Sequence, residues 1–106
     1  MGARNMYDVD FYRGDAEVVR NAIVEVLSTS TIIMEPKARK SFVIVNTGSS
    51  PITIHFGSKK AVAFEGLVLA VGSSYAESRS NGFEIFTGTI TGISHSGTGQ
   101  LSIIER

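Results

Sequence analysis

Residues 42–56 decide the fold, and they read Phe-Val-Ile-Val-Asn-Thr-Gly-Ser-Ser-Pro-Ile-Thr-Ile-His-Phe. Phe42 and Ile44 fall on one face of an extended chain, as do Ile52, Ile54 and Phe56 further on. Period-two alternation of this kind is typical of a β-strand. The cluster Thr47-Gly48-Ser49-Ser50-Pro51 between the two runs is a strong turn signal. The stretch therefore predicts a β-hairpin with a loop of about five residues.

The same alternation and the same breakers continue outward to the C-terminus. Further strands are expected over residues 61–70 (bent at Gly66), 83–87, 89–93 and 100–105. Turns are expected at Val71-Gly72-Ser73-Ser74, at Asn81-Gly82, which is a favoured hairpin pair, and at Ser96-Gly97-Thr98-Gly99. Strands at this spacing predict an all-β fold, a small antiparallel β-sandwich or barrel of about seven or eight strands.

Residues 15–34 admit two interpretations. Val19, Ala22, Ile23, Val26 and Leu27 fit one face of a helix over residues 15–27, with Asp15 as its N-cap. The segment is also rich in Val and Ile, which favour strands, and Ser28-Thr29-Ser30-Thr31 would interrupt a helix. We favour two strands, over residues 22–27 and 31–34.

The N-terminal part differs from the rest of the chain. Residues 1–40 carry twelve of the twenty Lys, Arg, Asp and Glu residues, whereas nine of the eleven glycines come later. We expect an extended N-terminal arm over residues 1–21 and a β-sandwich domain over residues 22–106. Within the arm, Tyr7, Phe11, Tyr12 and Arg13 are the candidate interface residues, because aromatic side chains dominate interface energies. The same aromatics could instead close the end of the sandwich core.

Charge and composition exclude several classes of function. Ten basic and ten acidic residues give a net charge of zero, which provides no long-range attraction to nucleic acid or to an anionic membrane. There is no cysteine, so thiolate metal sites, cysteine nucleophiles and disulfides are excluded. No apolar run reaches membrane-spanning length, and no signal-peptide core follows Met1. We expect a protein made in the cytoplasm, and its neutrality favours association with other chains.

The residues that could carry chemistry are scattered. His55 is expected to face solvent from its strand, and His95 lies in a Ser-His-Ser-Gly turn, so neither suggests a triad or a metal site. Four single acids, Glu65, Glu77, Glu84 and Glu105, are expected to be solvated rather than paired for catalysis. We therefore expect no enzymatic activity, no metal and no cofactor.

One short basic run stands before the strand at residue 42. Lys37, Arg39 and Lys40 are interleaved with no aromatic residue and lie close to Glu35, which is a weak pattern for a nucleic-acid patch. A solvated turn is the favoured interpretation. Arg39 could alternatively anchor a loop by bidentate pairing with a carboxylate.

A resemblance to a known class of proteins begins in this region. The stretch from Arg39 to Ile54, followed by Phe56-Gly57, resembles a recurring element of small virion proteins of tailed bacteriophages. Three later segments are similar to the rest of that pattern: Leu69 to Gly72 followed by Tyr75, Gly88 to Ser94, and Leu101 to Glu105. The resemblance covers roughly residues 22–106.

This resemblance implies a β-sandwich on the surface of a virion. The implied role is that of a capsid cement, or decoration, protein that binds across neighbouring major capsid subunits and stabilises the shell. The implied partners are the major capsid protein and further copies of the chain, as a homodimer or homotrimer. The alternatives are a neck or tail structural component, and a small carbohydrate- or ligand-binding β module, which would need clustered exposed aromatics.

Overall fold

The computed structural model describes residues 19–79 and 84–106, and in this part of the chain it contains strands and no helix. The eight strands are β1 (Arg20–Val26), β2 (Thr31–Met34), β3 (Ser41–Asn46), β4 (Ile52–Phe56), β5 (Leu67–Leu69), β6 (Ser74–Ser78), β7 (Ile90–Ser94) and β8 (Gly99–Glu105). All pairings are antiparallel. The predicted all-β sandwich is confirmed.

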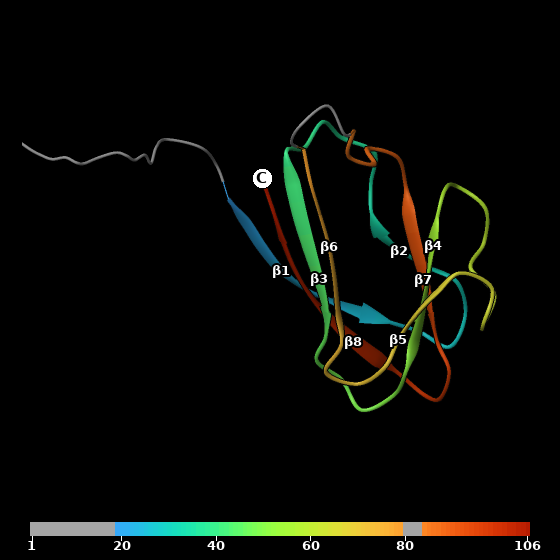
Figure 1. Cartoon of the computed structure of the whole chain (residues 1–106). Coiled ribbons are helices and arrows are strands. Elements are labelled where there is room, and N and C mark those ends of the chain that lie inside the picture. The colour runs from blue at the N-terminus through green and yellow to red at the C-terminus, as the bar shows by residue number, and fades with distance from the viewer. Residues whose placement is uncertain (1–18, 80–83) are drawn as a thin grey trace, which may run out of the picture.

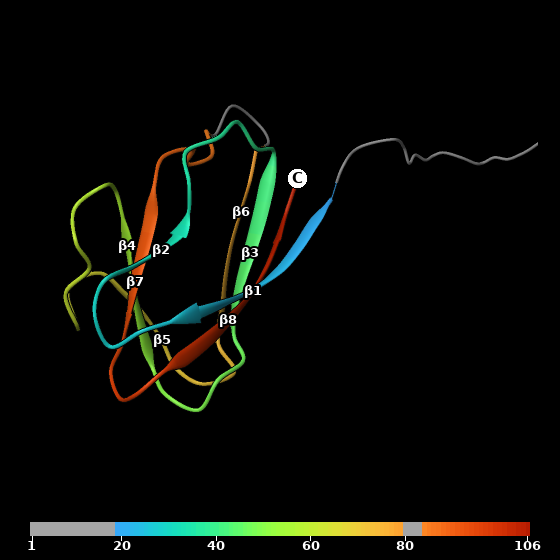
Figure 2. The ribbon, with the colours of Figure 1, turned by 180° about the vertical axis from the view of Figure 1, so that it is seen from behind.

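The strands form two sheets of four, with the orders β1-β8-β3-β6 and β2-β7-β4-β5. The two sheets face each other, and Figures 1 and 2 show them from opposite sides of the molecule. Strand β1 pairs with β8, β2 with β7, β3 with β6 and β4 with β5. This is the connectivity of a jelly roll, in which one long folded ribbon wraps around a single core.

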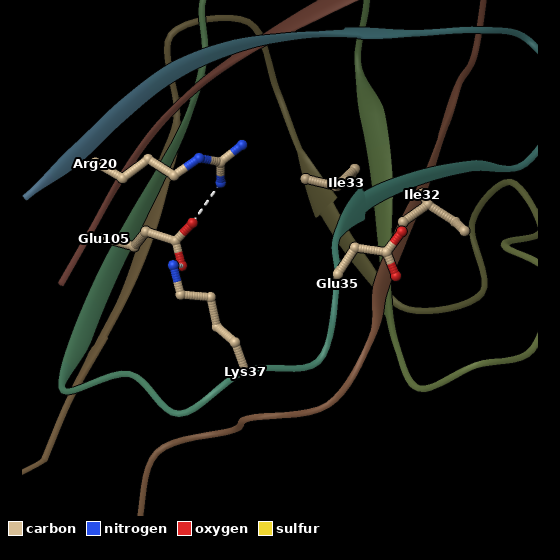
Figure 3. Close-up of a pocket in the computed structure, with 6 residues that line it drawn as sticks. All are labelled: Arg20, Ile32, Ile33, Glu35, Lys37 and Glu105. Carbon is tan, nitrogen blue, oxygen red and sulfur yellow. Dashed lines mark hydrogen bonds and ion pairs between the residues drawn. The ribbon is translucent and has the colours of Figure 1, made fainter.

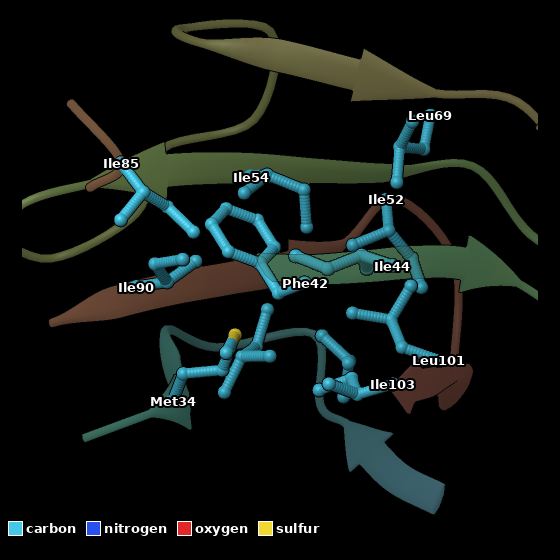
Figure 4. Close-up of a cluster of buried hydrophobic side chains, with 12 residues drawn as sticks. Met34, Phe42, Ile44, Ile52, Ile54, Leu69, Ile85, Ile90, Leu101 and Ile103 are labelled. Carbon is cyan, nitrogen blue, oxygen red and sulfur yellow. The ribbon is translucent and has the colours of Figure 1, made fainter. Parts of the chain in front are cut away.

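The core lies between the sheets and consists of the inward members of each alternating pattern. Figure 4 shows these side chains converging from strands of both sheets. The fully buried members include Phe42 and Ile44 from β3, Ile52 and Ile54 from β4, and Leu101 from β8. Branched aliphatic side chains dominate because they pack well on a pleated surface. The aromatic rings of Phe56, Tyr75 and Phe86 extend the core at one end.

Residues 20–26 form a strand, so the strand interpretation of this segment is confirmed against the helical one. β1 begins at Arg20, two residues before the expected domain boundary, and residues 20 and 21 pair with β8. The predicted strands at residues 31–34, 89–93 and 100–105 are also confirmed, as β2, β7 and β8.

The predicted hairpin over residues 42–56 is wrong, although both of its strands form. β3 and β4 lie in different sheets, so residues 47–51 cross from one sheet to the other. Buried Asn46 stabilises this crossover: its Nδ2 donates to the carbonyls of Ser50 (2.9 Å) and Leu69 (3.0 Å), and its Oδ1 accepts from Gly48 N (3.0 Å). These bonds satisfy the buried amide and tie the crossover to the end of β5.

Two further expectations need correction. The predicted strand over residues 61–70 is reduced to β5, because Phe64 and Gly66 have positive φ angles of 68° and 144° that interrupt an extended chain. Residues 84–87 of the predicted strand 83–87 are irregular rather than extended into a sheet. The Asn81-Gly82 turn lies outside the described residues.

Candidate functional site

The candidate interface residues from the sequence, Tyr7, Phe11, Tyr12 and Arg13, lie outside the described residues. The described residues hold no group of three or more His, Asp or Glu side chains that could bind a metal ion. They also contain no helix long and apolar enough to cross a membrane. The polar features that remain are an ionic cluster at the end of β8, two histidines, and the free edges of the sheets.

The ionic cluster centres on Glu105, whose side chain is only 1% exposed. Its carboxylate pairs with Arg20 through Oε2, and its Oε1 lies 3.4 Å from Arg39 Nε and 3.7 Å from Lys37 Nζ. Figure 3 shows Arg20 and Lys37 approaching the carboxylate from opposite sides of a pocket of about 320 Å³. Glu105 was expected to be solvated, and that prediction is wrong, because its register in β8 turns it inward with Leu101 and Ile103.

Arg39 is as deeply buried as Glu105, so the expectation of a solvated turn is wrong for this residue. Its Nη1 donates to Phe86 O (2.8 Å) and its Nη2 donates to Glu35 O (2.7 Å). The guanidinium therefore ties two loops together, which is the anchoring role considered from the sequence. The anchor uses two carbonyls and one carboxylate contact, not a bidentate carboxylate pair.

The cluster holds the end of the last strand in place. Neither Arg39 Nε nor Glu105 Oε1 has a hydrogen-bond partner among the described residues, so their mutual charge compensates their burial. The cluster fixes the end of β8 against β1 and the loop before β3.

The second polar group is a contact between β4 and the turn after β7. His95 Nε2 and Thr53 Oγ1 are 2.6 Å apart, and Thr53 Oγ1 also accepts from Phe64 N at 2.9 Å. The Phe64 ring lies over His95 with centroids 4.2 Å apart. Among the described residues, no serine hydroxyl is hydrogen-bonded to His55 or His95, so these residues form no Ser-His pair. His55 is half-buried on the outer side of β4.

A third polar contact attaches the irregular segment 84–87 to β6. Tyr75 OH donates to Glu77 Oε2 (2.6 Å), and Glu77 Oε1 accepts from Phe86 N (2.9 Å). The hydrogen bond to Glu77, helped by burial and by the negative charge of that carboxylate, raises the pKa of Tyr75 above its ordinary value. Glu77 is thus a partly buried acceptor, whereas the sequence predicted a solvated acid.

Each sheet has two open edges among the described residues, β1 and β6 in one sheet and β2 and β5 in the other. β5 has only three residues and the pairing of β2 is irregular, so β1 and β6 are the longer, regular edges. No strand of the described residues pairs with the outer side of β1 or of β6. At the two ends of the β3–β6 pairing, Asn46 N donates to Ser73 O and Arg79 N donates to Lys40 O. Because hydrogen bonding to one neighbour alternates along an antiparallel strand, the odd-numbered residues of β6 are the ones that bond to β3. The N–H groups of Ser74, Ala76 and Ser78 consequently face the open edge. An unpaired edge is a template for a further strand.

No protein-family model matches the chain, and no curated protein matches it. Among solved structures, the chain is similar to one described as "Bacillus endospore appendages form a novel family of disulfide-linked pili", with 21% identity and a TM-score of 0.40. The similarity covers 83% of this chain and 86% of that chain. At this level of similarity it assigns no function to this chain.

Proposed function

We propose that this chain is a structural protein that works by joining a multi-copy assembly through the open edges of its β1-β8-β3-β6 sheet. In its specific form the proposal is a capsid cement protein of a tailed bacteriophage, located on the virion surface. It would bind across neighbouring major capsid subunits. The specific form is supported by the resemblance of residues 22–106 to small virion proteins of such phages.

The observation that carries the proposal is that β1 and β6, the longer and more regular edge strands, have no outer partner strand among the described residues. Each edge presents a row of backbone donors and acceptors that a strand of a neighbouring subunit can complete, as in β-strand addition. A free soluble domain usually protects such edges with charge, proline or bulges. β6 has none of these on its outward positions, Ser74, Ala76 and Ser78, so its edge is suited to pairing.

Two alternatives are less well supported. Jelly rolls occur in viral capsid domains and also in lectins and cupins, so the topology alone does not choose between a shell protein and a ligand-binding module. A carbohydrate site needs clustered exposed aromatics. Phe64 is the only aromatic among the large hydrophobic side chains exposed in the described residues, which disfavours that reading. A neck or tail location would use the same edges and differs in copy number.

The test is binding to shells assembled without this protein. Purified full-length chain is mixed with such capsids, and the bound copies are counted by mass measurement of the particles. The cement role predicts on the order of hundreds of copies and a shell that resists heat better, whereas a ring of about six or twelve copies indicates the neck or tail. Absence of binding to any part of the particle would overturn the virion proposal.

The edge itself is tested with Ala76→Pro. This variant removes an edge N–H group but no ladder hydrogen bond, and proline is tolerated on edge strands. We expect shell binding to weaken at least about tenfold if β6 pairs with the partner, a loss of about 1.4 kcal/mol. Ala76→Ser keeps the N–H group and is the matched control. Equal binding by the two variants would exclude pairing through β6.

A further inference from the structure

The outer face of the β1-β8-β3-β6 sheet is unusually free of charge. The side chains that alternate with the core positions point outward here: Asn21, Ile23, Glu25, Ser41, Val43, Val45, Ser74, Ala76, Ser78, Gln100, Ser102 and Ile104. Only Glu25 among these strand residues is charged, and it lies near the end of β1. An outward sheet face normally carries polar and charged residues, so this composition indicates an interaction surface.

We call this outer face of the β1-β8-β3-β6 sheet the bare face, because no other segment of the described residues covers it. The outer face of the other sheet differs. Residues 57–66 fold over the outer side of β4 and β7, where Phe64 N donates to Thr53 Oγ1 and Thr91 Oγ1 donates to Lys59 O (3.2 Å). As a result, Thr53 is fully buried although it faces away from the core. On the bare sheet, by contrast, Ile23 is 71% exposed and Ile104 is 45% exposed. The chain therefore covers β4 and β7 in the middle of one sheet face, where only the flanking Ile32 and Val68 are exposed, and it leaves the other face open.

Side-chain size varies across the bare face in a regular way. The register places Ile23, Ser102, Val45 and Ser74 in one row across the four strands, so large and small side chains alternate. The adjacent row is Asn21, Ile104, Val43 and Ala76, with its two branched apolar residues in the middle. Both rows run from β1 at one edge to β6 at the other (Figure 2).

We propose that two copies of the chain pack these faces against each other about a two-fold axis parallel to the strands. Such an axis reverses the order of each row, so that β1 lies over β6 of the second copy and β8 lies over β3. Ile23 then faces Ser74, and Ser102 faces Val45, which puts every large side chain of that row opposite a small one. In the adjacent row Ile104 faces Val43. Interdigitated faces about 10 Å apart are the normal geometry of packed sheets.

A second copy fits this face better than the chain's own N-terminal segment does. Residues 1–18 carry four carboxylates, at positions 8, 10, 15 and 17. The outward-facing positions of these four strands contain no cation to pair with them, since Arg20 of β1 is paired with Glu105, and burying unpaired charge is costly. A second copy brings only its own Glu25, which lies at the rim.

The size of the face sets the strength of the contact. Four strands about 4.8 Å apart and about 20 Å long give a face of roughly 400 Å² in projection. A standard stable interface buries about 800 Å² per partner. The contact is therefore a weak, concentration-dependent dimer in solution that becomes persistent when copies are held side by side. This proposal goes beyond the assembly function, because it concerns the face of the sheet and not its edges.

Cysteine cross-linking tests the axis directly, since the chain has no native cysteine. Copies carrying Val45→Cys are mixed with copies carrying Ser102→Cys under mild oxidation. The proposed packing places these two positions opposite each other, so covalent dimers should form at least about tenfold faster than in the control mixture. In the control mixture, copies carrying Val45→Cys are combined with copies carrying Val68→Cys, a position on the other sheet. Equal rates in both mixtures would overturn the two-fold arrangement.

Sedimentation of charged variants tests the contact without cross-linking. Ile23→Lys introduces a charge at a position that is already exposed, so folding is retained, and thermal unfolding verifies this. Val68→Lys is the matched control on an exposed strand position of the other sheet. We expect the unmodified chain and Val68→Lys to show concentration-dependent dimers, and Ile23→Lys to dimerise at least about tenfold more weakly. A chain that stays monomeric at all concentrations would refute the proposal while leaving shell binding untouched.

Discussion

Arg39 and Glu105 form a buried ion pair in which Nε of the arginine lies 3.4 Å from Oε1 of the glutamate. The pair connects the loop before β3 to the last residue of β8. Neither atom has a hydrogen-bond partner among the described residues, so the buried charge of Arg39 depends on this carboxylate, whereas Glu105 is also compensated by Arg20 and Lys37. The closing strand of the jelly roll is thus held at its end by charge as well as by packing.

Replacing Glu105 by Gln should destabilise the fold strongly. The substitution leaves Arg39 charged, buried and without its carboxylate, and breaking one side of a buried pair costs about 3 kcal/mol. Urea unfolding measures the change in the free energy of unfolding. Glu65→Gln, at an exposed position in the loop after β4, is the control and should change stability by less than about 0.5 kcal/mol. A loss for Glu105→Gln as small as that of the control would show that the contact between Arg39 and Glu105 contributes little to the stability of the fold.

Arg39→Lys separates charge from geometry. A lysine keeps the positive charge, but it lacks the planar guanidinium whose two nitrogens donate to Phe86 O and Glu35 O at the same time. We expect a loss of about 2 kcal/mol in the free energy of unfolding. Arg79→Lys is the matched control at an exposed site. If both variants unfold at the same urea concentration, the fork contributes nothing beyond its charge.

Two glycines with positive φ angles should differ in their tolerance of alanine. Gly72 (φ 84°) has open space where a Cβ would lie, so Gly72→Ala should cost only about 1 kcal/mol of backbone strain. At Gly66 (φ 144°) a Cβ would overlap the carbonyl oxygen of Ile54. Because a strand backbone cannot move aside without disturbing its ladder, Gly66→Ala should cost at least about 3 kcal/mol. Thermal unfolding of the two variants compares them, and equal losses would refute the steric explanation.

Tyr75 gives the fold a pH dependence in the alkaline range. Its pKa is raised in the folded state by the hydrogen bond to Glu77, so the folded chain holds this proton more tightly than the unfolded chain does. The resulting stabilisation is complete below the ordinary tyrosine pKa of about 10 and is lost as pH rises through the folded-state pKa.

The measurement is an ultraviolet titration of tyrosinate in a background of Tyr7→Phe and Tyr12→Phe, which leaves Tyr75 as the single tyrosine. Glu77→Gln should bring the Tyr75 pKa back toward its ordinary value, because both the charge and the strongest acceptor are removed. An unchanged titration curve in Glu77→Gln would mean that burial, and not the hydrogen bond, raises the pKa.

Much of the strand content was predictable because each strand carries its own local pattern. β3, β4, β7 and β8 alternate apolar and polar residues and begin or end at glycine- or serine-rich turns, and the sequence predicts all four at nearly these bounds. The segment 61–66 was mistaken for part of a strand because its apolar residues cover the outside of a sheet instead of entering the core. The hydrophobic pattern of the sequence shows which residues are apolar, but not whether they pack in the core or on the outer face of a sheet.

The sequence by itself determined that this is an all-β chain of short strands, because period-two hydrophobicity and turn residues act over a few neighbours. Only the tertiary structure decided that β3 and β4 lie in different sheets and that Glu105 is buried against Arg39. Sheet partners and ion pairs join residues far apart in the chain, and many pairings satisfy the same local pattern. The choice among them is made by the packing of one shared core, which no single segment encodes.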